Sequence, residues 1–79
     1  MKVQVLGPGC SRCQQLEANT REALRLLGMN EPVEKVADIR EIMKFGVMMT
    51  PALAINGKVV LSGKVATPAE IQSAITSAP

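Results

Sequence analysis

Cys10 and Cys13 are the residues whose type and spacing can most directly carry chemistry in this 79-residue chain. A Cys-x-x-Cys pair serves thiol–disulfide exchange, and the same spacing also occurs in zinc sites. A structural zinc site takes four Cys or His ligands, whereas this chain has two cysteines and no histidine. A disulfide across so short a segment also adds at most about 2 kcal/mol of stability. We therefore expect a redox-active dithiol, with no metal and no other cofactor.

The residues around the pair predict unequal roles for the two thiols. Gly7-Pro8-Gly9 is a strong chain break, so Cys10 should stand at the amino end of the helix that follows. Unpaired backbone N–H groups and the helix dipole favour a thiolate there, and Arg12 is a candidate cation beside it. Cys13, one turn further on and in line with Leu16, should be less exposed. This pattern predicts that Cys10 attacks and that Cys13 resolves the mixed disulfide.

Hydrophobic periodicity indicates the elements that must position this pair. Polar and apolar residues alternate in the first strand, with Val3 and Val5 on one face, and apolar residues recur at helical spacing from Cys13 to Leu27, before Gly28. Beyond Gly28, short apolar runs are again separated by residues that break regular structure. The expected strands cover residues 2–6, 33–36, 52–55 and 58–61, and the later helices begin at Asp38 and Thr67.

Caps and turns support these boundaries. Asn56-Gly57 between two apolar runs is a strong signal for a β-hairpin. Thr67 fits a helix N-cap with Glu70 as its reciprocal partner, and Asp38 fits the same role with Glu41.

The later helices should each present an apolar stripe to the core. The residues expected in these stripes are Ile39, Ile42 and Met43 in the first, and Ile71, Ala74 and Ile75 in the second. Met48 and Met49 are soft-metal ligands in principle, but methionine more often fills gaps in a core, so packing is the prediction for both.

The resulting order, β-α-β-α-β-β-α, predicts an α/β fold with a four-stranded mixed sheet and three helices. With 47% hydrophobic and 20% charged residues, the chain fits one domain over residues 1–79. A right-handed crossover makes the first two strands parallel. If the strand after Pro51 runs antiparallel to the first, Pro51 arrives beside Cys10. Pro51 could be an ordinary trans proline at the start of an edge strand, or it could follow a cis bond, which X-Pro permits at a small cost. Its expected place beside Cys10 favours cis.

Composition excludes several classes of partner. Phe45 is the sole aromatic residue and the net charge is +2, so neither a base-stacking platform nor a basic stripe for nucleic acid is present. The first residues lack the features of a signal peptide, and no apolar run is long enough to cross a membrane. We expect a cytoplasmic monomer without membrane insertion.

In its motifs the chain resembles the thioredoxin superfamily, and in its length the small, glutaredoxin-sized redox-active disulfide proteins of that superfamily. The resemblance rests on Cys10-Ser11-Arg12-Cys13 after the first strand, Thr50-Pro51 before the hairpin, and Gly63 before the last helix. It implies a thiol–disulfide oxidoreductase with nucleophile Cys10, resolving Cys13, and a substrate-binding Thr50 and cis-Pro51. Its partners would be protein disulfides and an unidentified thiol reductant or reductase. The supporting residues would be Pro8, Gly9, Ser11, Arg12 and Gly63.

Departures from the family pattern leave the electron donor open. Thioredoxin's Trp-Cys-Gly-Pro-Cys and glutaredoxin's Cys-Pro-Tyr-Cys are absent, and no acid stands in Ser62-Gly63-Lys64-Val65, where glutaredoxins carry one for glutathione.

Two alternative readings remain. A copper-chaperone-like domain also places Cys-x-x-Cys after its first strand, and two thiolates can hold Cu(I). That family has Met where this chain has Pro8, however, and its β-α-β-β-α-β order ends in a strand. The other alternative is an interaction module with a redox fold and no turnover, for which the sequence gives no positive mark.

Overall fold

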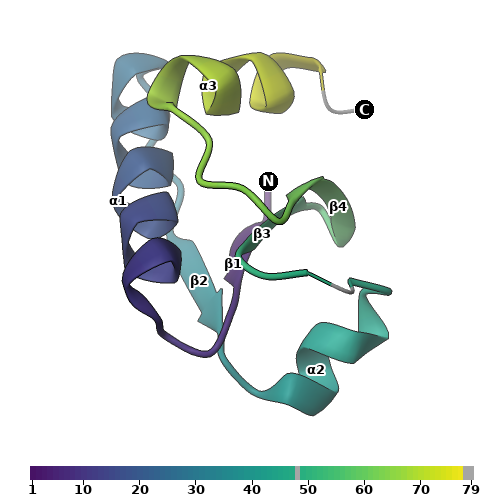
Figure 1. The fold of residues 1–79 in the computed structure, drawn as a ribbon. Helices are drawn as coiled ribbons and strands as arrows, with labels where there is room; N and C mark the ends of the chain where they lie inside the picture. Colours follow the sequence, from purple (N-terminus) through teal and green to yellow (C-terminus); the bar gives the residue numbers. More distant parts are fainter. Residues whose placement is uncertain (48, 78–79) are drawn as a thin grey trace.

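The computed structural model describes residues 1–47 and 49–77 and has the expected β-α-β-α-β-β-α order (Figure 1). The strands are β1 (Val3–Leu6), β2 (Val33–Val36), β3 (Ala52–Ile55) and β4 (Lys58–Ser62), and the helices are α1 (Ser11–Leu26), α2 (Ile39–Lys44) and α3 (Pro68–Ser77). They build one mixed sheet in the order β2-β1-β3-β4. The predicted α/β class is confirmed. Within the described ranges, no helix has the length and apolar character needed to cross a membrane.

Strand β1 lies inside the sheet, parallel to β2 and antiparallel to β3. The register sets Leu6 opposite Ala52, so the end of β1 and the start of β3 meet at the same edge of the sheet. β3 returns as β4 through Asn56-Gly57, whose φ angles are 53° and 82°. Two positive φ angles in succession match the twist of the flanking strands, which confirms the predicted hairpin.

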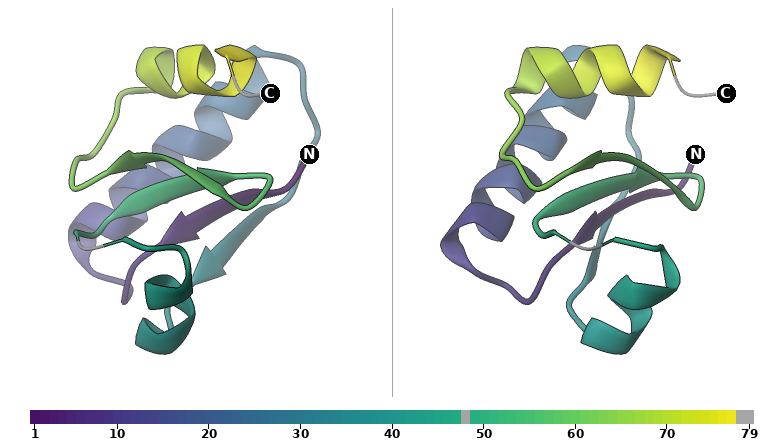
Figure 2. Two further views of the ribbon diagram at one scale, coloured as in Figure 1. Left: turned by 90° about the vertical axis from the view of Figure 1, so that its right-hand side faces the viewer. Right: turned by 45° about the vertical axis from the view of Figure 1, so that its right-hand side comes forward.

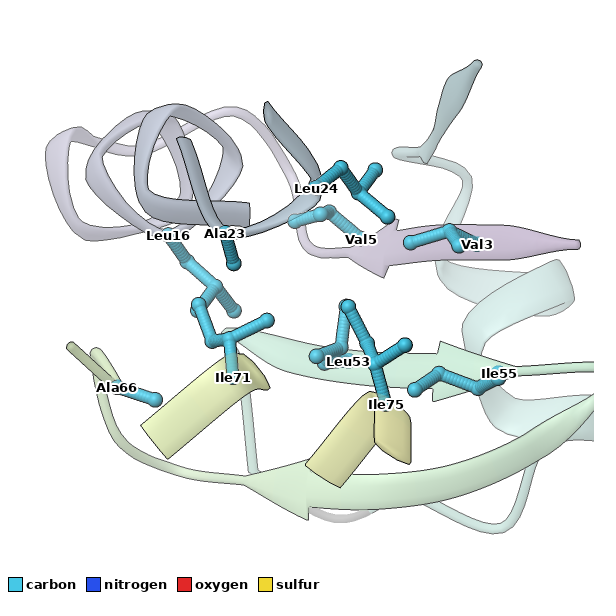
Figure 3. Close-up of a cluster of buried hydrophobic side chains, with 10 residues drawn as sticks. All are labelled: Val3, Val5, Leu16, Ala23, Leu24, Leu53, Ile55, Ala66, Ile71 and Ile75. Carbon is cyan, nitrogen blue, oxygen red and sulfur yellow. The ribbon is translucent and has the colours of Figure 1, made fainter. Parts of the chain in front are cut away.

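The two faces of the sheet are covered unequally. Helices α1 and α3 pack on one face, and α2 lies on the other (Figure 2). The larger cluster of buried side chains, shown in Figure 3, comprises Val3, Val5, Leu16, Ala23, Leu24, Leu53, Ile55, Ala66, Ile71 and Ile75. The smaller cluster, under α2, comprises Leu6, Ile42, Ala52 and Ala54.

Strand β1 is buried on both faces. Val3 and Val5 share the face toward α1, as predicted, while Gln4 points to the opposite side and is only 4% exposed. The Gln4 side chain donates a hydrogen bond of 3.0 Å to the Glu34 carboxylate on β2, and this bond offsets the cost of burying the amide.

Helix α1 ends at the predicted glycine. Leu27 is the C-cap and Gly28 follows with φ 70°. The backbone N–H of Gly28 donates to the Arg25 carbonyl, and that of Met29 donates to the Leu24 carbonyl at 2.9 Å. These two bonds form a Schellman motif, which requires the left-handed residue that glycine supplies at low cost.

Helix α3 begins with the predicted capping box. The Thr67 N–H donates to the Glu70 carboxylate at 3.0 Å, and the Glu70 N–H donates to the Thr67 hydroxyl at 3.2 Å. Ile71 and Ile75 are buried and Ala74 is half-buried, so the predicted inner face is confirmed.

The predicted apolar stripe of α2 is wrong in two of its three positions. Ile42 is buried, but Ile39 and Met43 are 59% and 67% exposed. The helix has six residues, and so short a helix meets the sheet with a single side chain. Met49 is 64% exposed, which also contradicts its predicted role in the core. The same prediction for Met48 lies outside the described residues.

The capping of α2 follows the prediction in part. The Asp38 carboxylate accepts a hydrogen bond from the Arg40 N–H at 2.8 Å, as an N-cap should. Glu41, expected to bond back to the cap, instead contacts Lys44 at 3.1 Å. Both Glu41 and Lys44 are exposed, and this ion pair contributes little to stability.

Candidate dithiol active site

The two cysteines lie where the chain leaves β1 and enters α1 (Figure 1). Cys10 is the N-cap of α1, with extended backbone angles of −71° and 170°, and its Sγ accepts a hydrogen bond from the Cys13 backbone N–H at 3.4 Å. An N-cap side chain ordinarily satisfies one of the open N–H groups of the first turn. A sulfur in this role faces the positive end of the helix, as the sequence predicts.

The two thiols differ in their access to solvent. Both cysteines are free thiols; Cys10 is exposed, whereas Cys13 is 5% exposed and lies one turn before the fully buried Leu16. Their Sγ atoms are 2.8 Å apart in a hydrogen bond. A partner molecule can therefore reach the Cys10 sulfur, while the Cys13 sulfur is shielded from solvent and in contact with Cys10.

The environment shifts the pKa values of the two thiols in opposite directions. The pKa of Cys10 is lowered, first by the hydrogen bond from the Cys13 thiol and then by the Cys13 backbone N–H. Burial raises the pKa of Cys13, and its hydrogen bond to Cys10 raises it further, since the Cys13 thiol must keep its proton to donate. Cys10 is therefore the more readily ionised thiol of the pair, and Cys13 the less readily ionised one.

Arg12 contributes differently from the prediction. Its guanidinium donates to the Gly63 carbonyl at 3.4 Å, in the segment between β4 and α3. The Arg12 backbone N–H, rather than its side-chain charge, is among the causes that lower the pKa of Cys10. The side chain therefore links the first turn of α1 to a segment distant in the sequence.

Thr50 lies beside Gly7, which is in the loop before the cysteines, and Gly63 contacts Arg12, which stands between them. The Thr50–Pro51 peptide bond is cis, and Pro51 is buried. The Pro51 carbonyl accepts a hydrogen bond of 2.9 Å from the Gly63 N–H. A Cβ placed on Gly63 would lie 3.2 Å from the Cβ of Met49, so the exposed methionine lies directly against this glycine. The topology thus brings Thr50, Pro51 and Gly63 close to the segment that carries the two cysteines.

The other predicted supporting residues surround Cys10 at the surface. Pro8, Gly9 and Ser11 are exposed, and Gly9 has φ 91°, which favours glycine. The Gly9 carbonyl accepts a hydrogen bond of 3.2 Å from the Gln14 side chain. Pro8, Gly9 and Ser11 thus flank Cys10 in an exposed loop, and Cys10 remains exposed among them.

A cavity of about 120 Å³ adjoins Cys13, and sequence reasoning missed most of its lining. Gly7, Glu17 and Lys35 contribute to it together with Cys13. The pKa of Glu17 is lowered, chiefly by its hydrogen bond from Arg21, and Lys35 lies 3.7 Å from its other oxygen. The helical spacing of Cys13 and Glu17 is the one sequence signal for this neighbourhood.

Gly7 is a second residue of the site that the sequence patterns do not indicate. In the sequence it reads as part of a chain break, whereas in the structure it is buried and its N–H donates to the Val36 carbonyl at 2.9 Å. A Cβ at this position would overlap the Sγ of Cys13. Nothing in hydrophobic periodicity signals such a contact.

Two features together define the thioredoxin-like class of dithiol proteins. One is a cysteine pair at the start of the first helix, and the other is a four-stranded mixed sheet in the order β2-β1-β3-β4. A family model described as a thioredoxin domain matches residues 1–76. A thioredoxin of Methanothermobacter thermautotrophicus is 38% identical over 76 residues, covering 96% of this chain and 99% of that protein. A thioredoxin of Methanocaldococcus jannaschii is 32% identical over 75 residues, covering 95% and 86%.

The chain therefore belongs to the thioredoxin family and is a thioredoxin-like redox protein. The resemblance stated from Cys10-Ser11-Arg12-Cys13, Thr50-Pro51 and Gly63 is confirmed at the level of the family. The copper-chaperone alternative is not favoured, since the chain follows β4 with α3 in place of a final strand.

Proposed function

We propose that the protein is a thiol–disulfide oxidoreductase that acts on protein disulfides through Cys10 and Cys13. The supporting observation is the contrast between two adjacent sulfurs. Cys10 is exposed and its pKa is lowered, while Cys13 is 5% exposed and its pKa is raised. Because the thiolate is the nucleophile in thiol exchange, Cys10 reacts first.

In the reducing direction the Cys10 thiolate attacks one sulfur of a substrate disulfide. A Cys10–substrate disulfide forms, and the other substrate sulfur leaves as a thiolate. Cys13 then loses its proton to solvent and attacks the Cys10 Sγ, so that the Cys10–Cys13 bond forms and the bond to the substrate breaks. Two electrons pass from the dithiol to the substrate. The reverse sequence introduces a disulfide, and the cysteine pair is the only redox group required.

The position of Thr50 near the cysteine pair supports an extended protein segment as the substrate. Thr50 is half-buried beside Gly7, so its backbone lies near the cysteine pair. The Arg12 guanidinium donates to the Gly63 carbonyl at 3.4 Å, which joins the first turn of α1 to the segment before α3. A substrate strand that pairs with the Thr50 backbone would bring its disulfide to the Cys10 sulfur.

The proposed partners are protein disulfides and a thiol reductant or reductase that returns the pair to its dithiol form. We place the reaction in the cytoplasm, where thiols are kept reduced, and assign it to a monomer. Because Ser62-Gly63-Lys64-Val65 contains no acid of the kind that binds glutathione in glutaredoxins, the electron donor stays open. Both glutathione and dithiothreitol are therefore used as test reductants.

Equilibration with glutathione and dithiothreitol redox buffers, followed by thiol counting and mass measurement, tests the proposal. A reversible two-electron transition between roughly −120 and −300 mV is expected. Absence of that transition, with thiols blocked by stoichiometric Cu(I) or Zn(II) that survives a competing chelator, would overturn it in favour of metal binding.

Alkylation against pH tests the assignment of roles. Single-cysteine variants Cys13→Ser and Cys10→Ser report Cys10 and Cys13 separately. Cys10 should react faster than Cys13 and at lower pH, and Cys13→Ala should slow Cys10 at low pH because it removes the hydrogen bond that contributes most to the lowered pKa. Equal pH profiles for the two thiols would contradict the assignment.

A further inference from the structure

We propose that Gly7 is a positioning residue of the dithiol site, where the absence of a side chain creates the space that holds the Cys13 sulfur against Cys10. This inference rests on the proposed function and deepens it. It assigns the positioning of the resolving thiol to a buried glycine that precedes both cysteines.

Gly7 differs from the other glycines, all of which fall in the described ranges. A Cβ on Gly7 would overlap the Cys13 Sγ and lie 3.2 Å from the Cys13 Cβ. Gly9, Gly28, Gly46 and Gly57 have no neighbouring atom within 4 Å of such a Cβ. These four have positive φ, and Gly7 does not. A Cβ on Gly63 would also meet a neighbour, the Met49 Cβ at 3.2 Å, but Gly63 has a positive φ of 73°. Glycine at position 7 therefore provides room for a sulfur, rather than freedom for the backbone.

Thr50 lies close to the same position, with its Cβ 3.8 Å from the Cβ position of Gly7. The cavity of about 120 Å³ adjoins Gly7 and Cys13 and extends toward Glu17. Non-bonded heavy atoms settle at about 3.5–4.0 Å, so an alanine at position 7 displaces the sulfur by about 1 Å or more. The adjoining cavity gives the displaced sulfur room to leave its 2.8 Å contact with the Cys10 sulfur.

This displacement affects one chemical step more than the other. In the first step the Cys10 thiolate attacks the substrate, and a Cβ at position 7 does not reach the Cys10 sulfur. In the second step the Cys13 thiolate must approach the Cys10 Sγ in line with the bond to the substrate sulfur, which then leaves as a thiolate. A misplacement of about 1 Å costs such a reaction on the order of 100-fold.

Rapid mixing of the reduced protein with a peptide disulfide, acid quenching and mass measurement separate the two steps. Gly7→Ala should leave the rate of mixed-disulfide formation within about threefold of the wild-type rate, and slow its resolution on the order of 100-fold. The mixed disulfide then accumulates. In a glutathione buffer the internal disulfide should form at least tenfold less favourably, which corresponds to a potential about 30 mV higher.

Gly28→Ala is the matched control. It introduces the same side chain at a glycine beyond the far end of α1, where backbone strain lowers stability but no atom lies within 4 Å of the new Cβ. Resolution and potential should both remain at wild-type values. If Gly7→Ala resolves the mixed disulfide as fast as Gly28→Ala, the inference is overturned while the proposed function stands.

A double-mutant cycle with Cys13→Ala tests the contact itself, by urea unfolding of the four proteins. Gly7→Ala should destabilise the wild type more than it destabilises Cys13→Ala, because the clashing sulfur is gone in the second background. If Gly7→Ala does not fold alone, Cys13→Ala should restore folding. Equal losses in both backgrounds, or no rescue, would overturn the inference even if the wild type showed no redox activity and the proposed function failed.

Discussion

Thr67→Ala should destabilise the protein by about 1 kcal/mol, the typical loss for an N-cap threonine. The hydroxyl of Thr67 accepts the Glu70 N–H at 3.2 Å, and its removal leaves this donor without its partner in the first turn of α3. Thr67 is exposed, so water compensates part of the loss and the upper end of the usual range does not apply. In a domain of 79 residues this change lowers Tm by about 4–8 °C.

Unfolding must be followed by circular dichroism, because the chain has no Trp or Tyr. Thr76→Ala in the same helix is the control. Within residues 1–47 and 49–77, the Thr76 hydroxyl donates to carbonyls of its own helix, those of Gln72 and Ser73, so its removal should change stability by less than about 0.5 kcal/mol. Equal losses for Thr67→Ala and Thr76→Ala would refute the claim that the capping box fixes the start of α3.

Two further predictions concern the segment between β4 and α3. The contact with Lys64, followed by the Thr67 N–H, lowers the pKa of Glu70 from 4.5 to about 2. The pKa in the folded state is therefore below that of the unfolded chain, so this stabilisation is present above about pH 4.5 and is lost as the pH falls toward 2. Glu70→Gln should remove that part of the acid dependence in urea unfolding at several pH values, and an unchanged slope would contradict the assignment. Arg12→Ala should raise KM for a protein disulfide while leaving Cys10 alkylation by iodoacetamide unchanged, since its guanidinium contacts Gly63; a matching loss of alkylation rate would show that its charge acts on the thiol.

Local sequence signals predicted much of the fold because each reports a local physical preference. Asn56-Gly57 predicted the hairpin from its ease of positive φ, and Thr67 with Glu70 predicted the start of α3 from reciprocal hydrogen bonds. The position of Cys10 at a helix start followed from the chain break before it. In each case the deciding interaction lies within a few residues of the signal.

The errors arise where tertiary packing decides the outcome. Ile39 and Met43 fit an apolar helical stripe, but α2 is too short to bring both to the sheet. Arg12 was expected to act on a neighbour and instead reaches Gly63, 51 positions away. Gly7 looked like a turn residue, and its contact with Cys13 depends on how closely β1 approaches α1. Short-range patterns carry no information on such distances.

The unequal clusters on the two faces of the sheet imply that α1 and α2 open at different free energies. Helix α1 is supported by the larger cluster, shared with α3, whereas α2 is supported by the four buried residues of the cluster around Ile42. Segments with few buried apolar contacts exchange their amide hydrogens through local opening, at a fraction of the global free energy. The α2 amides should therefore exchange well before those of α1. The cysteine pair would therefore stand on the helix that opens last, while the opposite face of the sheet opens without disturbing it.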